Sequence, residues 1–169
     1  IFAMKKPIYK TVPYLQKVMT RYPIDSDIKK LSIAGDDLLY AASSKGLHKL
    51  ENGVWSTVLE NENITDVFTD KNGRTFAASG KRLYSVNENE IAVRHEFPED
   101  ITAIGGETRF YVLTTKRLLG EYEGEFIAEN NTETPCFFLD EKNGRVCLGN
   151  NETLTRLEGK RKTMRMITS

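Results

Sequence analysis

The feature that most constrains the fold is a segment that the chain repeats four times. The copies begin at Ile28, Ile64, Ile101 and Pro135, so successive starts lie 36, 37 and 34 residues apart. DKNGRTFAAS at 70–79 and EKNGRVCLGN at 141–150 are the same turn and strand in two of the copies. A period of this length is typical of architectures in which one small unit stacks on the next.

Each copy is predicted to form four short strands. An apolar segment is followed by a turn with Gly, Asp or Asn, which supply the backbone conformations that a hairpin needs, and then by segments rich in Val, Ile, Tyr, Phe and Thr, which favour strands. The second strand carries an aromatic or apolar residue at Tyr40, Phe76, Tyr111 and Cys147. A hydroxyl or amide side chain follows at Ser43, Ser79, Thr114 and Asn150. Each copy therefore reads as an antiparallel meander.

Four-stranded units at this period indicate a β-propeller, because one small sheet buries both of its faces only when neighbouring sheets stack on it. We predict an all-β chain with four antiparallel blades at 28–63, 64–100, 101–134 and 135–169.

The repeat also resembles a known family. The second copy reads I-x-x-V-x-x-D-x-x-G-x-x-F-A-A-S from Ile64, and S-S-K-G-L follows the corresponding strand of the first copy. This is similar to the repeat of the two-component-regulator propellers, whose strand is Trp-Ile-Gly-Thr-like; here Tyr40, Phe76, Tyr111 and Cys147 replace the tryptophan. The resemblance implies a propeller of the kind found in extracytoplasmic sensor domains and some polysaccharide-active proteins. It transfers no catalytic residue.

Four blades leave the architecture open, since the commonest propellers have six to eight. An isolated arc exposes an apolar blade face and strand edges at each end. A closed four-bladed ring, a fragment of a longer propeller and two chains joined as arcs all fit the sequence. We expect an arc of a larger ring, with another copy of the chain or missing blades as its partner.

The N-terminal segment 1–27 has two interpretations. Residues 21–28 resemble 96–101, the connection between the second and third copies, which favours an outermost closure strand at 14–22. Pro13 with apolar residues at helical spacing instead favours a short helix.

Composition excludes some partners. The chain has 24 basic and 24 acidic residues, so it lacks the positive field that attracts nucleic acid or anionic membranes. No apolar run approaches the length of a membrane helix. We therefore expect no nucleic acid and no membrane as partners. The start of the chain lacks the features of a secretory signal, which favours the cytoplasm unless a signal peptide was removed.

One set of basic residues recurs at equivalent places. Loops after the second strand and between blades share one face of a propeller, where binding sites usually gather. The candidate binding residues there are Lys45, Lys81, Arg82, Lys116 and Arg117. They would suit an anionic or carbohydrate ligand. Acidic residues on the same face, among them Glu62 and Glu99, would instead screen them on a solvated surface.

Other reactive residue types form no recognisable site. His48 and His95 lie in different blades without a partner at catalytic or metal-binding spacing, so each is interpreted as a partly exposed strand residue. Cys136 and Cys147 lie on neighbouring strands, and the sequence leaves open whether they are bonded. Acidic residues in the turns, such as Asp70, are explained by Asx-turns rather than by calcium. We expect no metal and no cofactor.

The function predicted from the sequence is a non-catalytic binding or interaction module that uses these loops. Two alternatives stay open. One is part of a carbohydrate-active propeller enzyme, a polysaccharide lyase or hydrolase. The other is the sensory input domain of a two-component-type regulator.

Overall fold

Four antiparallel sheets make up the protein, each with four strands in chain order. The computed structural model describes residues 22–87, 90–132, 135–158 and 161–166. No helix occurs within these ranges. The sheets follow one another as the blades of a propeller, which confirms the predicted all-β fold. From the first blade to the fourth the strands are β1 Ile28–Gly35, β2 Leu38–Ser43, β3 Gly46–Glu51, β4 Val54–Glu60; β5 Asp66–Thr69, β6 Thr75–Ser79, β7 Arg82–Val86, β8 Ile91–Glu96; β9 Ile101–Gly105, β10 Tyr111–Thr114, β11 Arg117–Tyr122, β12 Glu125–Asn131; β13 Phe138–Lys142, β14 Arg145–Gly149, β15 Thr153–Glu158 and β16 Arg161–Met166.

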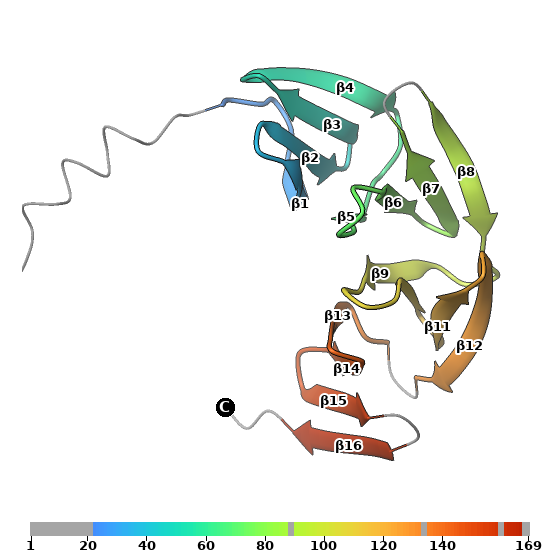
Figure 1. Ribbon diagram of the computed structural model, residues 1–169. Coiled ribbons are helices and arrows are strands. Elements are labelled where there is room, and N and C mark those ends of the chain that lie inside the picture. Colours follow the sequence, from blue (N-terminus) through green and yellow to red (C-terminus); the bar gives the residue numbers. More distant parts are fainter. Residues whose placement is uncertain (1–21, 88–89, 133–134, 159–160, 167–169) are drawn as a thin grey trace, which may run out of the picture.

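The four blades form an open arc (Figure 1). The first strand of each blade, β1, β5, β9 and β13, lies on the concave side, and the last strand lies on the convex side. Blades 1 and 4 stand at the two ends, and each leaves one sheet face without a neighbouring blade.

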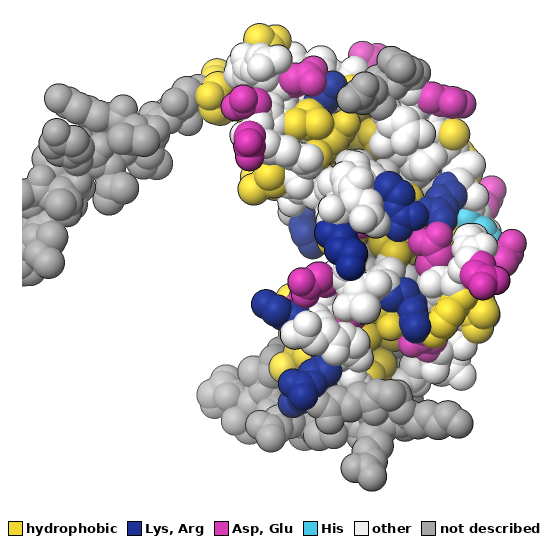
Figure 2. Space-filling model, in the orientation of Figure 1, with side chains coloured by type: hydrophobic (Ala, Val, Ile, Leu, Met, Phe, Trp, Pro, Cys, Tyr) yellow, Lys and Arg dark blue, Asp and Glu magenta, His cyan; other side chains and the backbone are white. Residues whose placement is uncertain are grey.

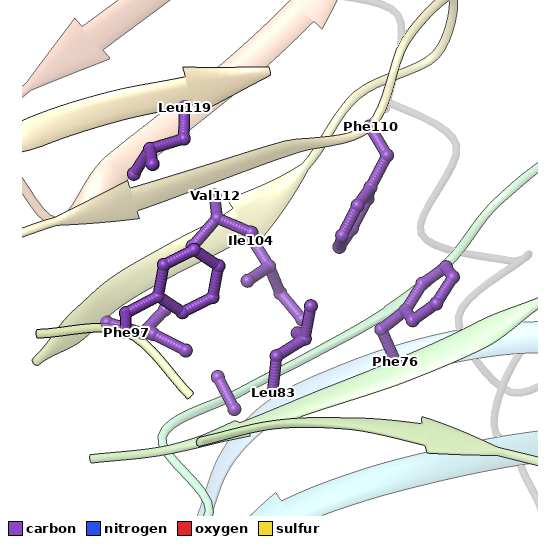
Figure 3. Close-up of a cluster of buried hydrophobic side chains, with 9 residues drawn as sticks. Phe76, Leu83, Phe97, Ile104, Phe110, Val112 and Leu119 are labelled. Carbon is purple, nitrogen blue, oxygen red and sulfur yellow. The ribbon is translucent and has the colours of Figure 1, made fainter. Parts of the chain in front are cut away.

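The blades are held together by apolar clusters between neighbouring sheets. Alternate residues of a strand point to opposite faces, so each second strand contributes to both of its interfaces. In blade 2, Phe76 and Ala78 face blade 3, while Ala77 faces blade 1. The interface between blades 2 and 3 is aromatic, with the Phe76 and Phe110 ring centroids 4.4 Å apart (Figure 3).

The turn Ser43–Gly46 shows why the sequence needs glycine at a specific place. Gly46 has φ of 149°, and a Cβ at this position would lie 2.0 Å from the carbonyl oxygen of Leu59 on the neighbouring strand. Only a residue without a side chain lets β4 approach so closely.

The two interpretations of the segment 14–22 concern residues that lie almost wholly outside the described ones. From Tyr22 onward the chain follows the first blade without regular structure before β1 begins. The Trp55 indole donates a hydrogen bond to the Tyr22 carbonyl oxygen at 3.1 Å, and Ser44 at the other end of the blade donates to Asp27. Residues 22–27 therefore run from one end of blade 1 to the other.

Candidate functional site

The candidate site lies on the face that carries the inter-blade connections. This connection face is made of the turns 43–46, 79–82, 114–117 and 150–153 together with the connections 60–64 and 96–101 and the described residues of the third connection, 131–132 and 135–137. The opposite side, the hairpin face, carries the other turns, such as 69–75 and 142–145. All five predicted binding residues stand on the connection face, in the first three of its turns.

The side chains that precede the basic residues shape the turns. Ser43 Oγ accepts hydrogen bonds from the backbone N–H of Lys45 and Gly46, both at 3.1 Å. Thr114 Oγ1 accepts from the N–H of Arg117 at 3.0 Å, and Asn150 Oδ1 from that of Thr153 at 2.8 Å. In blades 1, 3 and 4 the recurring hydroxyl or amide is thus a structural element of the turn, of the kind that such side chains commonly form. In blade 2, Ser79 Oγ instead donates to Glu62 at 2.9 Å.

The arginines are paired with carboxylates of the connection that leads into their own blade. Arg82 donates to Glu62 at 2.9 Å, and Arg117 donates to both oxygens of Glu99 at 2.8 and 2.7 Å. In blade 1 a glycine, Gly46, holds the arginine position, and the Lys45 ammonium one residue earlier lies 3.6 Å from an Asp25 carboxylate oxygen. One ion pair per blade is therefore repeated on three consecutive blades.

Lys81 and Lys116 differ from these residues. Both side chains are exposed, and neither forms an ion pair with any part of the chain that the structure describes. The connection 97–101 lies between their two turns: the Phe97 N–H donates to the Lys81 carbonyl oxygen at 2.9 Å, and the Thr115 N–H donates to the Asp100 carbonyl oxygen at 3.0 Å. The two lysines therefore stand on either side of one connection.

Charge is mixed over the face of the arc that Figure 2 shows. Figure 2 shows basic and acidic side chains next to one another along the visible face of the arc, without a large region of one sign. This agrees with the zero net charge of the sequence. Binding of an anion would then depend on the local arrangement of a few lysines.

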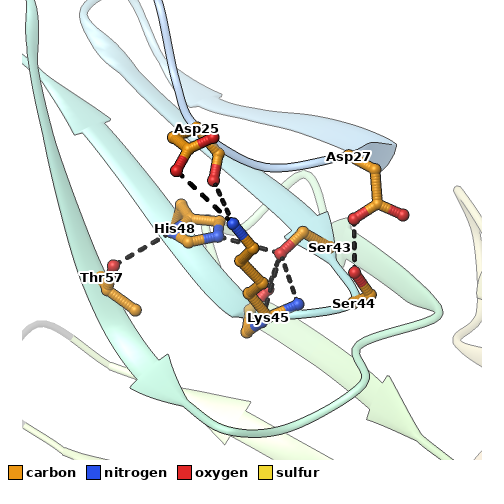
Figure 4. A network of polar contacts seen from close by, with 8 residues as sticks. Asp25, Asp27, Ser43, Ser44, Lys45, His48 and Thr57 are labelled. Atoms are coloured by element: carbon orange, nitrogen blue, oxygen red, sulfur yellow. Dashed lines mark hydrogen bonds and ion pairs between the residues drawn. The ribbon is translucent and has the colours of Figure 1, made fainter.

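His48 is buried, which differs from the sequence interpretation. Its Nε2 lies 2.9 Å from Ser43 Oγ, and its Nδ1 lies 3.1 Å from Thr57 Oγ1 (Figure 4). Burial lowers the pKa of His48, and the positive charge of Lys45 lowers it further. The alternation of the strand gave no sign of this, because residues 22–27 lie along this blade. His95 is half-buried and packs against Phe97, with ring centroids 4.4 Å apart.

Two acidic side chains stabilise the fold through hydrogen bonds to the backbone. Asp66 on β5 is buried and accepts the N–H of Ile104 on β9 at 3.0 Å; its burial raises its pKa. Glu141 accepts the N–H of Thr108 and of Gly144, each at 2.6 Å; burial acts to raise its pKa, but these hydrogen bonds outweigh burial and lower it. Neither role was predicted from the sequence.

Asp70 forms the predicted Asx-turn by accepting the N–H of Asn72 at 2.9 Å. Cys136 and Cys147 form no disulfide: Cys136 is buried between blades 3 and 4, and Cys147 belongs to the other face of blade 4. Among the described residues, no three His, Cys, Asp or Glu side chains are grouped so that they could hold a metal ion.

An open cleft of about 560 Å³ lies between blades 1 and 2 on the hairpin face. Tyr40, Thr75, Asn87 and Glu90 contribute polar groups to its lining. None of the predicted binding residues contacts this cleft.

Comparison with known proteins identifies the fold but no family. No protein-family model and no curated protein matches the chain. The chain is similar to the extracellular domain of a protein described as a hybrid two-component system from B. thetaiotaomicron, with 13% identity and a TM-score of 0.71 over 85% of this chain and 22% of that one. It is also similar to virginiamycin B lyase from Staphylococcus aureus, with 13% identity and a TM-score of 0.73 over 89% of this chain and 60% of that one.

A third similar structure is PorZ, a surface component of the type-IX secretion system of Porphyromonas gingivalis. It shares 18% identity and has a TM-score of 0.62 over 92% of this chain and 23% of that one. The chain therefore spans from about a quarter to three fifths of the length of these structures. At this level of identity the likeness establishes the propeller fold.

The chain is thus a four-bladed β-propeller arc. Its structural neighbours include an extracellular domain of a two-component system, the family that the sequence repeat resembles, and an enzyme. None of the described residues belongs to a helix that could cross a membrane.

Proposed function

We propose that the chain is a non-catalytic binding module that takes an anionic ligand, such as an acidic carbohydrate, on its connection face. The observation that carries the proposal is the pair Lys81 and Lys116, two exposed ammonium groups at equivalent turns of adjacent blades. The neighbouring Arg82 and Arg117 are held in place by Glu62 and Glu99. A ligand with two acidic groups would bridge the lysines without displacing either arginine.

A binding module of this kind could serve as a sensor domain, and the likeness to known structures supports this role. Such a domain needs to bind and release its ligand, and a solvated site of exposed lysines gives modest affinity. The likeness to the extracellular domain of a two-component system supports this alternative, and the likeness to a lyase supports the enzymatic one.

The test is isothermal titration with oligogalacturonate and, separately, with a sulfated heparin oligosaccharide. The double variant Lys81→Ala/Lys116→Ala should weaken binding about tenfold, because each exposed ion pair contributes up to roughly 0.7 kcal/mol and 1.4 kcal/mol is a factor of ten. The matched control Lys71→Ala/Lys142→Ala removes the same charge from the hairpin face.

The control variant should bind as the wild type does. Equal losses in both double variants would show that attraction is non-specific, and absence of binding to either probe would contradict the anionic-ligand proposal. Chain-length analysis of the oligosaccharide after incubation separates the alternatives, since shortened products would show a lyase or hydrolase.

A further inference from the structure

A leucine recurs at one position of each blade and is buried in all blades but the last. In the register of the second and third strands, Leu47 pairs with Ala42, Leu83 with Ala78 and Leu118 with Leu113. All three leucines are 0% exposed, because the following blade covers them. In blade 4 the equivalent pair is Gly149 and Leu154, and Leu154 is 40% exposed.

The opposite end of the arc shows the complementary pattern. On the face that meets the preceding blade, Val67 and Ile104 on the inner strands are 1% and 3% exposed. Leu31 holds this place in blade 1 and is 53% exposed. Ile33, on the same face of the same strand, is 75% exposed.

We call the part of this blade 1 face that residues 22–27 leave exposed the leading face (Leu31, Ile33, Leu39 and Leu50). The open face of blade 4 is the trailing face. It has Phe138, Gly149 and Leu154 at its connection end, and Asp140, Cys147 and Arg156 nearer its hairpin end. At each of the three interfaces inside the chain, the face equivalent to the trailing face packs against the face equivalent to the leading face of the next blade. Figure 1 shows that the two faces stand at separate ends of the arc, so they do not meet within one chain.

We propose that the leading face of one chain binds the trailing face of a second copy, head to tail. Such a contact extends the existing interface instead of requiring a new one. Two arcs related by a two-fold axis along the channel would have two such contacts.

Charge at the hairpin ends favours this pairing. The hairpin ends of neighbouring blades adjoin in this fold, as Glu141 of blade 4 shows by binding the Thr108 N–H of blade 3. Lys142 and Arg145 flank the hairpin of blade 4, and Asp36 and Asp37 form that of blade 1. In the head-to-tail contact the basic hairpin would lie beside the acidic one.

The leading face also has a hollow that a partner could fill. The hollow has a volume of about 210 Å³ and lies beside the hairpin end. Its lining includes the apolar Ile33, Leu39 and Leu50 as well as Asp36 and Asp37. At the hairpin end the trailing face carries Cys147 with the basic Arg145 and Arg156. In the head-to-tail contact these basic side chains would lie beside the acidic wall of the hollow.

Glu152 offers an independent test, because it opposes the pairing. It holds the turn position that Lys45, Lys81 and Lys116 hold in the other blades. At those turns the lysine lies beside the connection to the next blade, and carboxylates occur in these connections. In the head-to-tail contact Glu152 would face the connection 22–27 of the second copy, which carries Asp25 and Asp27. Its replacement by lysine should therefore strengthen the contact.

The experiment is light scattering after gel filtration of the full chain over a range of concentrations. The wild type should associate, and Glu152→Lys should associate about three to ten times more tightly, as expected for exposed charges. Leu31→Glu and Leu154→Glu should each weaken association about a hundredfold or more, because a carboxylate loses hydration in an apolar contact. Val93→Glu, at a 50% exposed position on the outer strand β8, is the matched control and should not change association.

Mixing the two defective variants tests the head-to-tail geometry. Leu31→Glu retains a native trailing face, and Leu154→Glu retains a native leading face, so the mixture should regain one native contact and associate more tightly than either variant alone. Circular dichroism and thermal unfolding check that all variants fold.

A wild type that stays monomeric at every concentration would overturn the proposal. Association that neither leucine variant weakens would overturn it as well, as would a mixture no better than its components.

Discussion

Replacing the recurring leucine by alanine tests the packing between blades. The same substitution is compared at a buried position, Leu83, and at an exposed one, Leu154. Leu83→Ala removes three carbons from a side chain that is 0% exposed and packed with Phe76, Val112 and Phe97. At about 0.8 kcal/mol for each buried methylene the transfer loss is about 2.4 kcal/mol, and the cavity left behind raises the cost to about 3–5 kcal/mol. Leu154→Ala makes the same change at a 40% exposed position and should cost about 1 kcal/mol or less in the monomer.

The measurement is urea unfolding followed by circular dichroism, at a protein concentration low enough to keep the chain monomeric. The denaturant dependence m should stay unchanged, so that a shifted midpoint reports stability alone. Equal costs for the two substitutions, or a loss well below 1 kcal/mol for Leu83→Ala, would refute the packing register.

The remaining substitutions test individual contacts, each by chemical denaturation. The free energy of unfolding should fall as the pH is lowered through about 6.5, because burial lowers the pKa of His48 and the unfolded chain then binds a proton that the folded chain does not; His48→Gln should remove this slope. Glu141→Gln should cost about 1.5–3 kcal/mol near neutral pH, and should remove the contribution of Glu141 to the loss of stability that the wild type shows as the pH falls below about 4.3. Gly46→Ala should cost more than about 2 kcal/mol, whereas Gly73→Ala, where no atom lies within 4 Å of the added Cβ, should cost about 1 kcal/mol. Unchanged stability in Gly46→Ala would contradict the close approach of β4.

The blades could be predicted from the sequence because their signals are local. Strand alternation, the turn glycines and the hydroxyl at Ser43 or Thr114 depend on neighbouring residues, so they repeat with the copies. The turn position of Lys81 and Lys116 followed from the same alignment. That these side chains bind a ligand remains a prediction.

Contacts between blades could not be predicted, since they join residues far apart in the chain. Asp66 binds the backbone of residue 104, and Glu141 binds that of residue 108. The interpretation of His48 as partly exposed was wrong. Its burial depends on the packing of blade 1, which strand alternation does not indicate. An isolated Asp at an apolar position of an inner strand, such as Asp66, is a signal that could have indicated such a role.

The measurement that tests the proposed binding surface most directly is a map of amide chemical shifts of the isotopically labelled chain during titration with oligogalacturonate. The account predicts shifts concentrated in the turns 79–82 and 114–117 and in the connection 97–101 between them. Shifts confined to the hairpin face, such as the turns 69–75 and 142–145, or no shifts at all, would contradict it.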